Sequence, residues 1–344
     1  MERHWKVSIS IIMAILVVVF LVACAPAARG EPVEEAKALV VYSGLGEYET
    51  ARLLNKFTEE TGIKTEFMRL SGGELIARVI IEKANPMGDI FFGGSTEGHE
   101  VVRAEGCLRP YKSPALAEID PKFYDPDGYW SGFYVGAIGI IVNNDRFKKD
   151  FPGKEMPKTW EDLLNPDYKG LITYSSPNTS GTAYTFVAGQ IFRLGEDKAW
   201  EYLENLSHNV GQYGATGAAP AQNVAMGEFT FGITFGHAIT QMMIAGYKVS
   251  MIFPEQTGSE IGALSIINGG PNPKAAEMFV DWMLGREAQQ LHSDLSSRIS
   301  THPEVTLPLG AIPLKDLVLV NYDVKWAADN KGRIVEEWNN RFGG

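Results

Sequence analysis

Residues 38–62, ALVVYSGLGEYETARLLNKFTEETG, place a short apolar run directly before a segment with helical periodicity. The first five residues are rich in valine and leucine, which favours a buried strand. Leu53, Leu54 and Phe57 then recur at helical spacing, and Gly62 ends the pattern. This stretch therefore predicts a strand, a short glycine-containing loop and a helix.

The same order of elements continues along the chain. Residues 64–70 predict a second strand, 73–84 a second helix and 89–92 a third strand. Successive strand-helix units imply a parallel sheet with helical crossovers. Residues 38–92 therefore predict an α/β fold.

A second α/β set follows without a break in composition. The predicted elements lie at 136–142, 160–164, 171–174, 181–194, 198–206, 231–235, 246–253, 263–267 and 273–284, before an amphipathic C-terminal helix with Val324 and Trp338. No Gly/Ser-rich linker separates the two sets. We therefore expect two lobes joined by crossing strands and not by a tether.

Composition limits the possible classes of function. The chain has 344 residues, of which 45% are hydrophobic and 21% are charged, so it can bury a large core. Lys and Arg number 31 against 42 Asp and Glu, a formal charge of −11. Binding of a phosphate backbone needs a basic surface, so we expect no nucleic-acid partner.

The N-terminus resembles a bacterial lipoprotein signal. Arg3 and Lys6 precede an uncharged run over 7–23, and the run closes with Leu-Val-Ala before Cys24, as in a lipobox. The alternative is an uncleaved membrane anchor, because seventeen apolar residues approach the length that spans a bilayer. We predict a signal peptide at 1–23, lipidation of Cys24, a tether at 24–37, and an extracytoplasmic protein anchored to a membrane by its lipid. Cys107 would then be a lone, buried thiol.

Three loops after predicted strands are small and rich in hydroxyl groups. They contain Ser43 and Gly44, then Ser95 and Thr96, and in the second half Thr179, Ser180, Gly181 and Thr182. Glycine lets backbone N–H groups approach a ligand, hydroxyls donate hydrogen bonds, and a helix N-terminus favours negative charge. The alternative for each loop is an ordinary helix cap or turn. Their recurrence after successive strands favours an anion site.

Enzyme motifs are incomplete in this chain. Residues 94–98, GSTEG, place the serine one position too early for a nucleophile elbow, and 99–103, HEVVR, lack the second histidine of a zinc motif. His237 ends the apolar segment 231–237, where its side chain would reach a ligand site or remain a core histidine. We expect neither a catalytic group nor a cofactor nor a metal.

Taken together, these segments resemble the extracytoplasmic solute-binding proteins of ABC importers, in the group that binds ferric iron, thiamine, phosphonates and sugar phosphates. The resemblance runs from about Leu39 to Trp338 and rests on 40–44, 88–93, 157–164, 166–170, 179–182, 254–262 and 272–276. It implies the two-lobe type II periplasmic-binding-protein fold, in which mostly parallel sheets flanked by helices are joined by crossing hinge strands. The implied division is 38–136 plus 263–305 for lobe 1, and 137–262 plus 306–344 for lobe 2.

The resemblance also bears on the ligand. Ferric-iron relatives typically supply adjacent tyrosines after a Gly-Glu and a short strand, where this chain has Gly236-His237-Ala238. Phosphonate and sugar-phosphate binders carry His-Asp there, so His237 matches them and Ala238 departs from them. Glu260 matches a position that accepts bonds from ligand hydroxyl or amine groups, with Glu255 as the alternative. The resemblance therefore implies capture of a small anionic solute, a phosphonate or a phosphate-bearing compound.

The remaining expectations concern partners and alternatives. We expect a monomer that captures its solute reversibly and then docks on an importer permease, although a sensor kinase would fit the same sequence. A ferric-iron-binding protein is the nearest alternative function. A hydrolase of phosphate esters is the alternative of another class.

Overall fold

The computed structural model describes residues 38–343. The predicted signal peptide, Cys24 and the tether lie outside the described residues. Within residues 38–343, no helix combines the length and the apolar character needed to cross a membrane.

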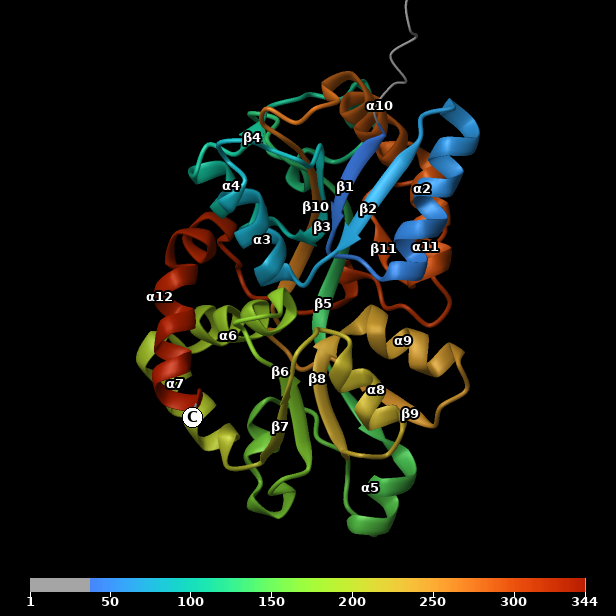
Figure 1. Ribbon diagram of the computed structural model, residues 1–344. Helices are drawn as coiled ribbons and strands as arrows, with labels where there is room; N and C mark the ends of the chain where they lie inside the picture. Colours follow the sequence, from blue (N-terminus) through green and yellow to red (C-terminus); the bar gives the residue numbers. More distant parts are fainter. Residues whose placement is uncertain (1–37, 344) are drawn as a thin grey trace, which may run out of the picture. The chain divides into compact units, whose positions relative to one another are not determined.

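The first sheet forms as the opening stretch of the chain predicts. Its parallel strands are β1 (Leu39–Ser43), β2 (Thr65–Arg69) and β3 (Ile90–Ser95), with β1 in the middle. Helices α2 (Glu47–Thr61), α3 (Gly72–Ile81) and α4 (Thr96–Ala104) each begin within four residues of a strand end. The three helix N-termini therefore gather at one edge of the sheet (Figure 1).

The second sheet repeats this arrangement. Strands β6 (Ile172–Ser175), β7 (Val210–Gly214) and β8 (Phe231–Phe235) are parallel, with β6 in the middle. The associated helices are α6 (Gly181–Leu194), α7 (Glu196–Ser207), α8 (Ala219–Ala225) and α9 (Gly236–Ile244). Here too, α6 and α9 begin just beyond the carboxyl ends of strands.

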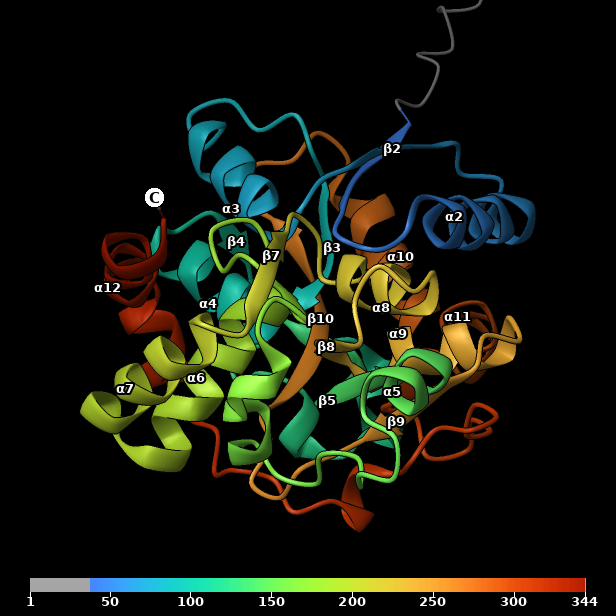
Figure 2. The same cartoon turned by 90° about the horizontal axis from the view of Figure 1, so that it is seen from below.

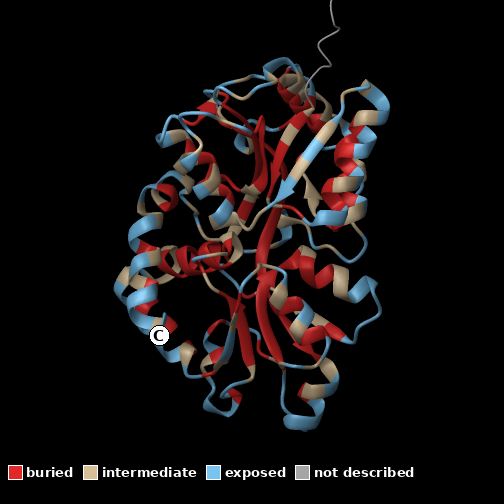
Figure 3. Ribbon diagram, in the orientation of Figure 1, coloured by how far each residue is buried: buried red, intermediate tan, exposed pale blue. Residues whose placement is uncertain are grey.

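Two long strands join the sheets. Strand β5 (Ser131–Asn143) pairs antiparallel with β10 (Ser259–Ile267) in its first half and with β8 and β9 (Val249–Ile252) in its second half. All thirteen residues of β5 are buried (Figure 3). The pairing changes from β10 at Ala137 to β8 at Ile138, so the chain passes from one sheet to the other within one continuous strand.

Each sheet has its own aromatic core. Phe92 packs between Phe133 and Phe279 in the first lobe, with ring centroids 5.1 and 5.2 Å away. In the second lobe Phe186 lies 5.3 Å from both Trp160 and Tyr174. Because the two cores are separate, each lobe can hold its shape while the connecting strands flex.

The remaining elements cover the edges. They are β4 (Leu108–Arg109), α5 (Asn144–Asp150), α10 (Pro273–Leu284), α11 (Arg286–Ser296), β11 (Ile299–Ser300), α12 (Val324–Phe342) and the short 3₁₀ helices Pro114–Glu118, Pro121–Phe123, Glu161–Leu164, Pro166–Tyr168 and Leu314–Asp316. Helix α11 packs on α2, whereas α12 packs on both α4 and α6 (Figures 1 and 2).

The structure differs from the predicted elements in several places. The segment 160–164 is mainly a 3₁₀ helix, and the predicted strand 136–142 is the second part of the longer β5. Gly93 and Gly94, expected in a loop, belong to β3 and have φ values of 80° and 85°. Helix α4 was not anticipated because its buried face carries Glu97 and His99, which mask the apolar periodicity.

Candidate functional site

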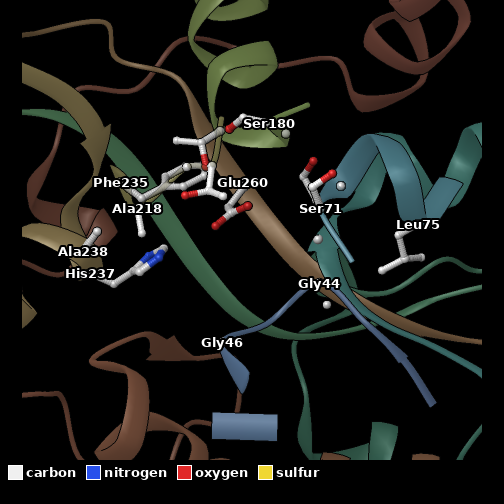
Figure 4. Close-up of a pocket in the computed structure, with 18 of the residues that line it drawn as sticks. Gly44, Gly46, Ser71, Leu75, Ser180, Ala218, Phe235, His237, Ala238 and Glu260 are labelled. Carbon is white, nitrogen blue, oxygen red and sulfur yellow. The ribbon is translucent and has the colours of Figure 1, made fainter. Parts of the chain in front are cut away.

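A cavity of about 370 Å³ lies where the helix N-termini of the two lobes meet. The first turns of α2, α3, α4, α6 and α9 contribute to its wall, through residues such as Gly46, Ser71, Ser95, Ser180 and His237. Figure 4 shows Ser71, Ser180 and His237 around one open space. The cavity is therefore bordered by the positive ends of helices from both sheets.

Most of the predicted site residues line this cavity. They are Gly44, Ser95, Thr179, Ser180, Gly181, Thr182, His237 and Glu260. Glu255, the alternative to Glu260, is exposed and does not line the cavity. These positions lie between residues 44 and 260 of the chain, and the two sheets bring them together.

Ser43 and Thr96 lie behind the cavity wall. The Ser43 hydroxyl shares a hydrogen bond with Thr50 (2.8 Å) and accepts one from the Leu45 backbone N–H (3.1 Å). Thr96 is buried, and its hydroxyl makes no hydrogen bond to the described part of the chain. Both residues therefore sit next to the loop that meets the cavity, and a direct role for them in binding stays a prediction.

The N-cap serines of α4 and α6 differ in whether their hydroxyl groups cap the helix. The Ser180 hydroxyl accepts a hydrogen bond from the Ala183 backbone N–H (3.3 Å), as an ordinary N-cap does. Ser95 occupies the N-cap of α4, but its side chain makes no capping bond. Within residues 38–343, the Ser95 hydroxyl and the first backbone N–H groups of α4 are therefore available to a ligand.

The lobes touch beside these caps. A Cβ atom on Gly72 of α3 would lie 3.4 Å from the backbone nitrogen of Gly181, and one on Gly181 would lie 3.5 Å from Ser95 Oγ. Residues with larger side chains would hold the two helix N-termini apart at this point. The small residues therefore allow both lobes to reach one ligand group.

A buried charge cluster lies on the first-lobe side of the cavity. The guanidinium of Arg298 donates to both oxygens of Glu49, at 2.7 and 2.9 Å, and lies 4.8 Å over the Tyr134 ring. His292 Nε2 is 2.8 Å from Glu49 Oε1. Burial by itself would raise the pKa of Glu49, but the charge of Arg298 and the contact with His292 lower it to about 2. The ionised carboxylate of Glu49 therefore holds the charged guanidinium of Arg298 in place.

Glu260 and His237 face the cavity at the crossing of β5 and β10. Glu260 pairs with Gly136, and a Cβ atom on Gly136 would lie 3.6 Å from both Glu260 Oε1 and His237 Nδ1. Burial raises the pKa of Glu260 to about 8, although Arg298 partly opposes the shift. Burial also lowers the pKa of His237, whose Nδ1 has no partner in the described chain. Figure 4 shows both side chains turned toward the open space.

Three cationic residues of the wall were not anticipated from the sequence. They are Arg69, Arg298 and Lys331. Arg69 ends β2, so its position at the carboxyl end of a strand was a usable signal. Arg298 follows α11 and Lys331 lies within α12, and no local pattern connects them with the earlier loops.

The described part of the chain places few metal-ligating side chains at this cavity. Among residues 38–343, no three His, Cys, Asp or Glu side chains gather as they would around a metal ion. Tyr48 and Tyr134 line the cavity. Burial and the nearby Glu260 raise the pKa of Tyr134, so its phenol stays protonated at neutral pH.

Comparison with protein families gives one match over most of the chain. Residues 85–311 match the model of a family described as "Bacterial extracellular solute-binding protein". A relative from Haemophilus influenzae, described as an uncharacterized protein, is 34% identical over 342 residues, which cover 97% of this chain and 96% of the relative. A putative 2-aminoethylphosphonate-binding periplasmic protein of Salmonella paratyphi A is 27% identical over 73% of each chain.

Solved structures show the same architecture. The periplasmic binding protein AfuA from Actinobacillus pleuropneumoniae, with fructose-6-phosphate bound, has a TM-score of 0.85 and 33% identity, and the match covers 89% of this chain and 98% of that one. A ferric binding protein from Campylobacter jejuni has a TM-score of 0.76 at 23% identity, with 88% and 99% covered. At 23% identity, the likeness to the ferric binding protein shows only that the two chains share a fold.

Proposed function

Because this chain belongs to the bacterial extracellular solute-binding proteins, which work with ABC importers, we propose that its solute is a phosphomonoester or phosphonate held in the interlobe cavity. The membership confirms the predicted family, its two-lobe fold, the extracytoplasmic location and a binding role instead of catalysis. The phosphate-ester hydrolase considered from the sequence is therefore set aside.

The proposal rests on the convergence of α3, α4 and α6. Their first turns line one cavity, and Ser95 and Gly181 approach each other from opposite lobes. A phosphoryl group carries up to two negative charges and several acceptor oxygens, which suits backbone N–H groups and hydroxyls at helix N-termini. Arg69 and Arg298 add positive charge to the same wall. Hydroxyl, amide and cationic donors thus surround the place where the anion would bind.

The rest of the solute would lie against the crossing strands. Glu260 can accept a hydrogen bond when ionised and donate one when protonated, and His237 has an unpartnered ring nitrogen. Both groups suit hydroxyl or amine substituents. The names of two relatives agree with this chemistry, since one is described as binding 2-aminoethylphosphonate and the other was solved with fructose-6-phosphate.

Calorimetric titration tests the proposal directly. Fructose 6-phosphate, 2-aminoethylphosphonate, orthophosphate, fructose and ferric citrate are titrated in turn into the purified soluble part of the protein. We expect binding of a phosphate or phosphonate compound and a loss of affinity of about tenfold in Ser95→Ala, because one charge-assisted hydrogen bond is lost. Ser207→Ala, at the end of α7, is the matched control. Binding of ferric citrate alone would replace the proposal with the ferric-iron alternative.

We also propose that the protein is anchored by a lipid on Cys24 and delivers its solute to a permease as a monomer. The lipid would hold the two lobes near the membrane after the signal peptide is removed. Cell fractionation of Cys24→Ala provides the test. Release of this variant from the membrane fraction is expected, and continued sedimentation with membranes would contradict the anchor.

A further inference from the structure

The C-terminal helix contributes to the solute cavity. Helix α12 packs on α4 of the first lobe and α6 of the second (Figure 1). Lys331 from this helix lines the cavity wall. Helix α12 is thus placed to offer a cation where both lobes meet.

The surroundings of Lys331 favour a fixed ammonium group. Its Nζ lies 4.8 Å from the centroid of the Tyr184 ring, in the first turns of α6. Burial lowers the pKa of Lys331, and the nearby carboxylate of Glu97 opposes this shift. No hydrogen bond joins the Lys331 ammonium to a protein oxygen among residues 38–343. Its N–H donors therefore remain available to a ligand.

Glu97 is a buried carboxylate near Lys331. It lies in the first turn of α4, two residues after Ser95, and its side chain is fully buried. Neither of its oxygens has a hydrogen-bond partner in the described chain. An isolated buried carboxylate is costly, so a nearby cation offsets much of that cost. Tyr184, Tyr322 and Glu260 are titratable groups near Glu97, and His99 is near Lys331.

Contacts to the second lobe hold α12 in place. Asn339 and Asn178 exchange side-chain hydrogen bonds of 2.5 and 2.9 Å, directly before the loop that carries Thr179 and Ser180. Arg341 pairs with Glu204 of α7, and Tyr184 donates to the Ala327 carbonyl. Lys331 therefore has a defined position relative to the α6 N-terminus.

We propose that Lys331 is an anion-binding residue of the interlobe cavity and that the buried carboxylate of Glu97 provides a nearby counter-charge for its ammonium group. This inference rests on the proposed function and extends it, because it assigns the counter-charge for the phosphoryl group to the C-terminal helix. The solute would then bind three parts of the chain at once: the first lobe, the second lobe and α12.

The test compares charge variants by calorimetric titration with fructose 6-phosphate, 2-aminoethylphosphonate and orthophosphate. Lys331→Met should weaken binding of the tightest of these compounds by about 10- to 100-fold, the effect of losing one charged hydrogen-bond partner. Lys331→Arg keeps the charge and should recover most of the affinity. Lys325→Met removes an exposed lysine of the same helix and should bind as the wild type does.

A double variant separates binding from folding. Lys331→Met leaves Glu97 buried without its cation, so Glu97→Gln/Lys331→Met removes both charges and should keep a melting temperature near that of the wild type while its binding stays weak. Binding by the double variant within twofold of the wild type would overturn the role of Lys331. If the wild type binds none of the three compounds, the proposed function itself fails, and the assignment of Lys331 falls with it.

Discussion

Gly73 of α3 lies so close to Asn178 of the opposite lobe that a Cβ atom at position 73 would come within 2.5 Å of the Asn178 carbonyl oxygen. Gly73 sits in the first turn of a helix and does not have a positive φ angle. The backbone there would accept alanine, so the requirement for glycine comes from the contact between lobes. The structure thus shows the lobes in close contact beside the cavity.

Gly73→Ala should weaken solute binding without unfolding the protein. The added methyl group would collide with backbone only when the lobes are close, while alanine favours the helix itself. We expect a loss of affinity of about tenfold or more, since the bound form would be destabilised relative to an open one. Calorimetric titration measures the affinity, and circular dichroism checks the fold.

Gly332→Ala is the control for this variant, because it is also a helical glycine but has no atom within 4 Å of the added Cβ. Equal affinities of Gly73→Ala and the wild type would show that the contact between lobes does not limit binding.

Arg298→Met should destabilise the folded protein by about 3–5 kcal/mol, because it leaves the buried carboxylate of Glu49 without its cation. Glu49→Gln/Arg298→Met removes both charges and should recover part of this loss. Urea unfolding measures the free energies. A single variant as stable as the wild type would mean that the contact with His292 is sufficient to hold the buried carboxylate of Glu49.

Glu260 should make the unliganded protein less stable at alkaline pH. Its pKa is raised to about 8 in the folded state, against 4.5 as the ordinary value, so the folded chain binds the proton more tightly than the unfolded chain. The contribution is complete below about 4.5 and is lost as the pH rises through about 8.

Glu260→Gln removes this titration. Between pH 6 and 9 the unfolding free energy of the wild type should fall by about 2–3 kcal/mol relative to that of the variant. Urea unfolding at the two pH values gives the difference. Parallel pH profiles would show that Glu260 is already ionised at pH 6.

Trp338→Ala should test how firmly α12 belongs to the second lobe. Trp338 is buried in the core of that lobe, with its ring 5.1 Å from Tyr213. We expect a loss of about 3–5 kcal/mol in the free energy of unfolding, typical of an aromatic truncation in a core. Asn340→Ala, on the exposed side of the helix, is the control. A loss below about 1 kcal/mol would mean that α12 packs independently of that core.

The spacing of apolar residues predicted the strands and helices whose buried faces are apolar. The apolar run before Ser43 formed β1, and the helical spacing of Leu53 and Phe57 formed α2. Helices with buried polar residues were missed, as in α4, where Glu97 and His99 face inward because tertiary contacts surround them. Periodicity of apolar residues cannot show such a helix.

Loop composition located much of the candidate site. Ser95 ends β3 of the first sheet and Ser180 follows β6 of the second, so each lies at the carboxyl end of a strand, where ligands of α/β sheets bind. Ser43 and Thr96 have the same residue types but are buried behind the wall, Ser43 in a hydrogen bond with Thr50. The orientation of a side chain at the end of a strand depends on its tertiary surroundings, which the sequence does not display.

The order of strands, helices and small loops was sufficient by itself to predict an α/β protein with two lobes and hydroxyl-rich loops at the ends of strands, because those features follow from residue periodicity and backbone chemistry. The cationic part of the site was decided by the tertiary structure. Arg298 meets Glu49 across 249 positions of the chain, and Lys331 reaches the cavity from the last helix. Electrostatic attraction acts through space, so only the folded chain selects which distant charges become neighbours.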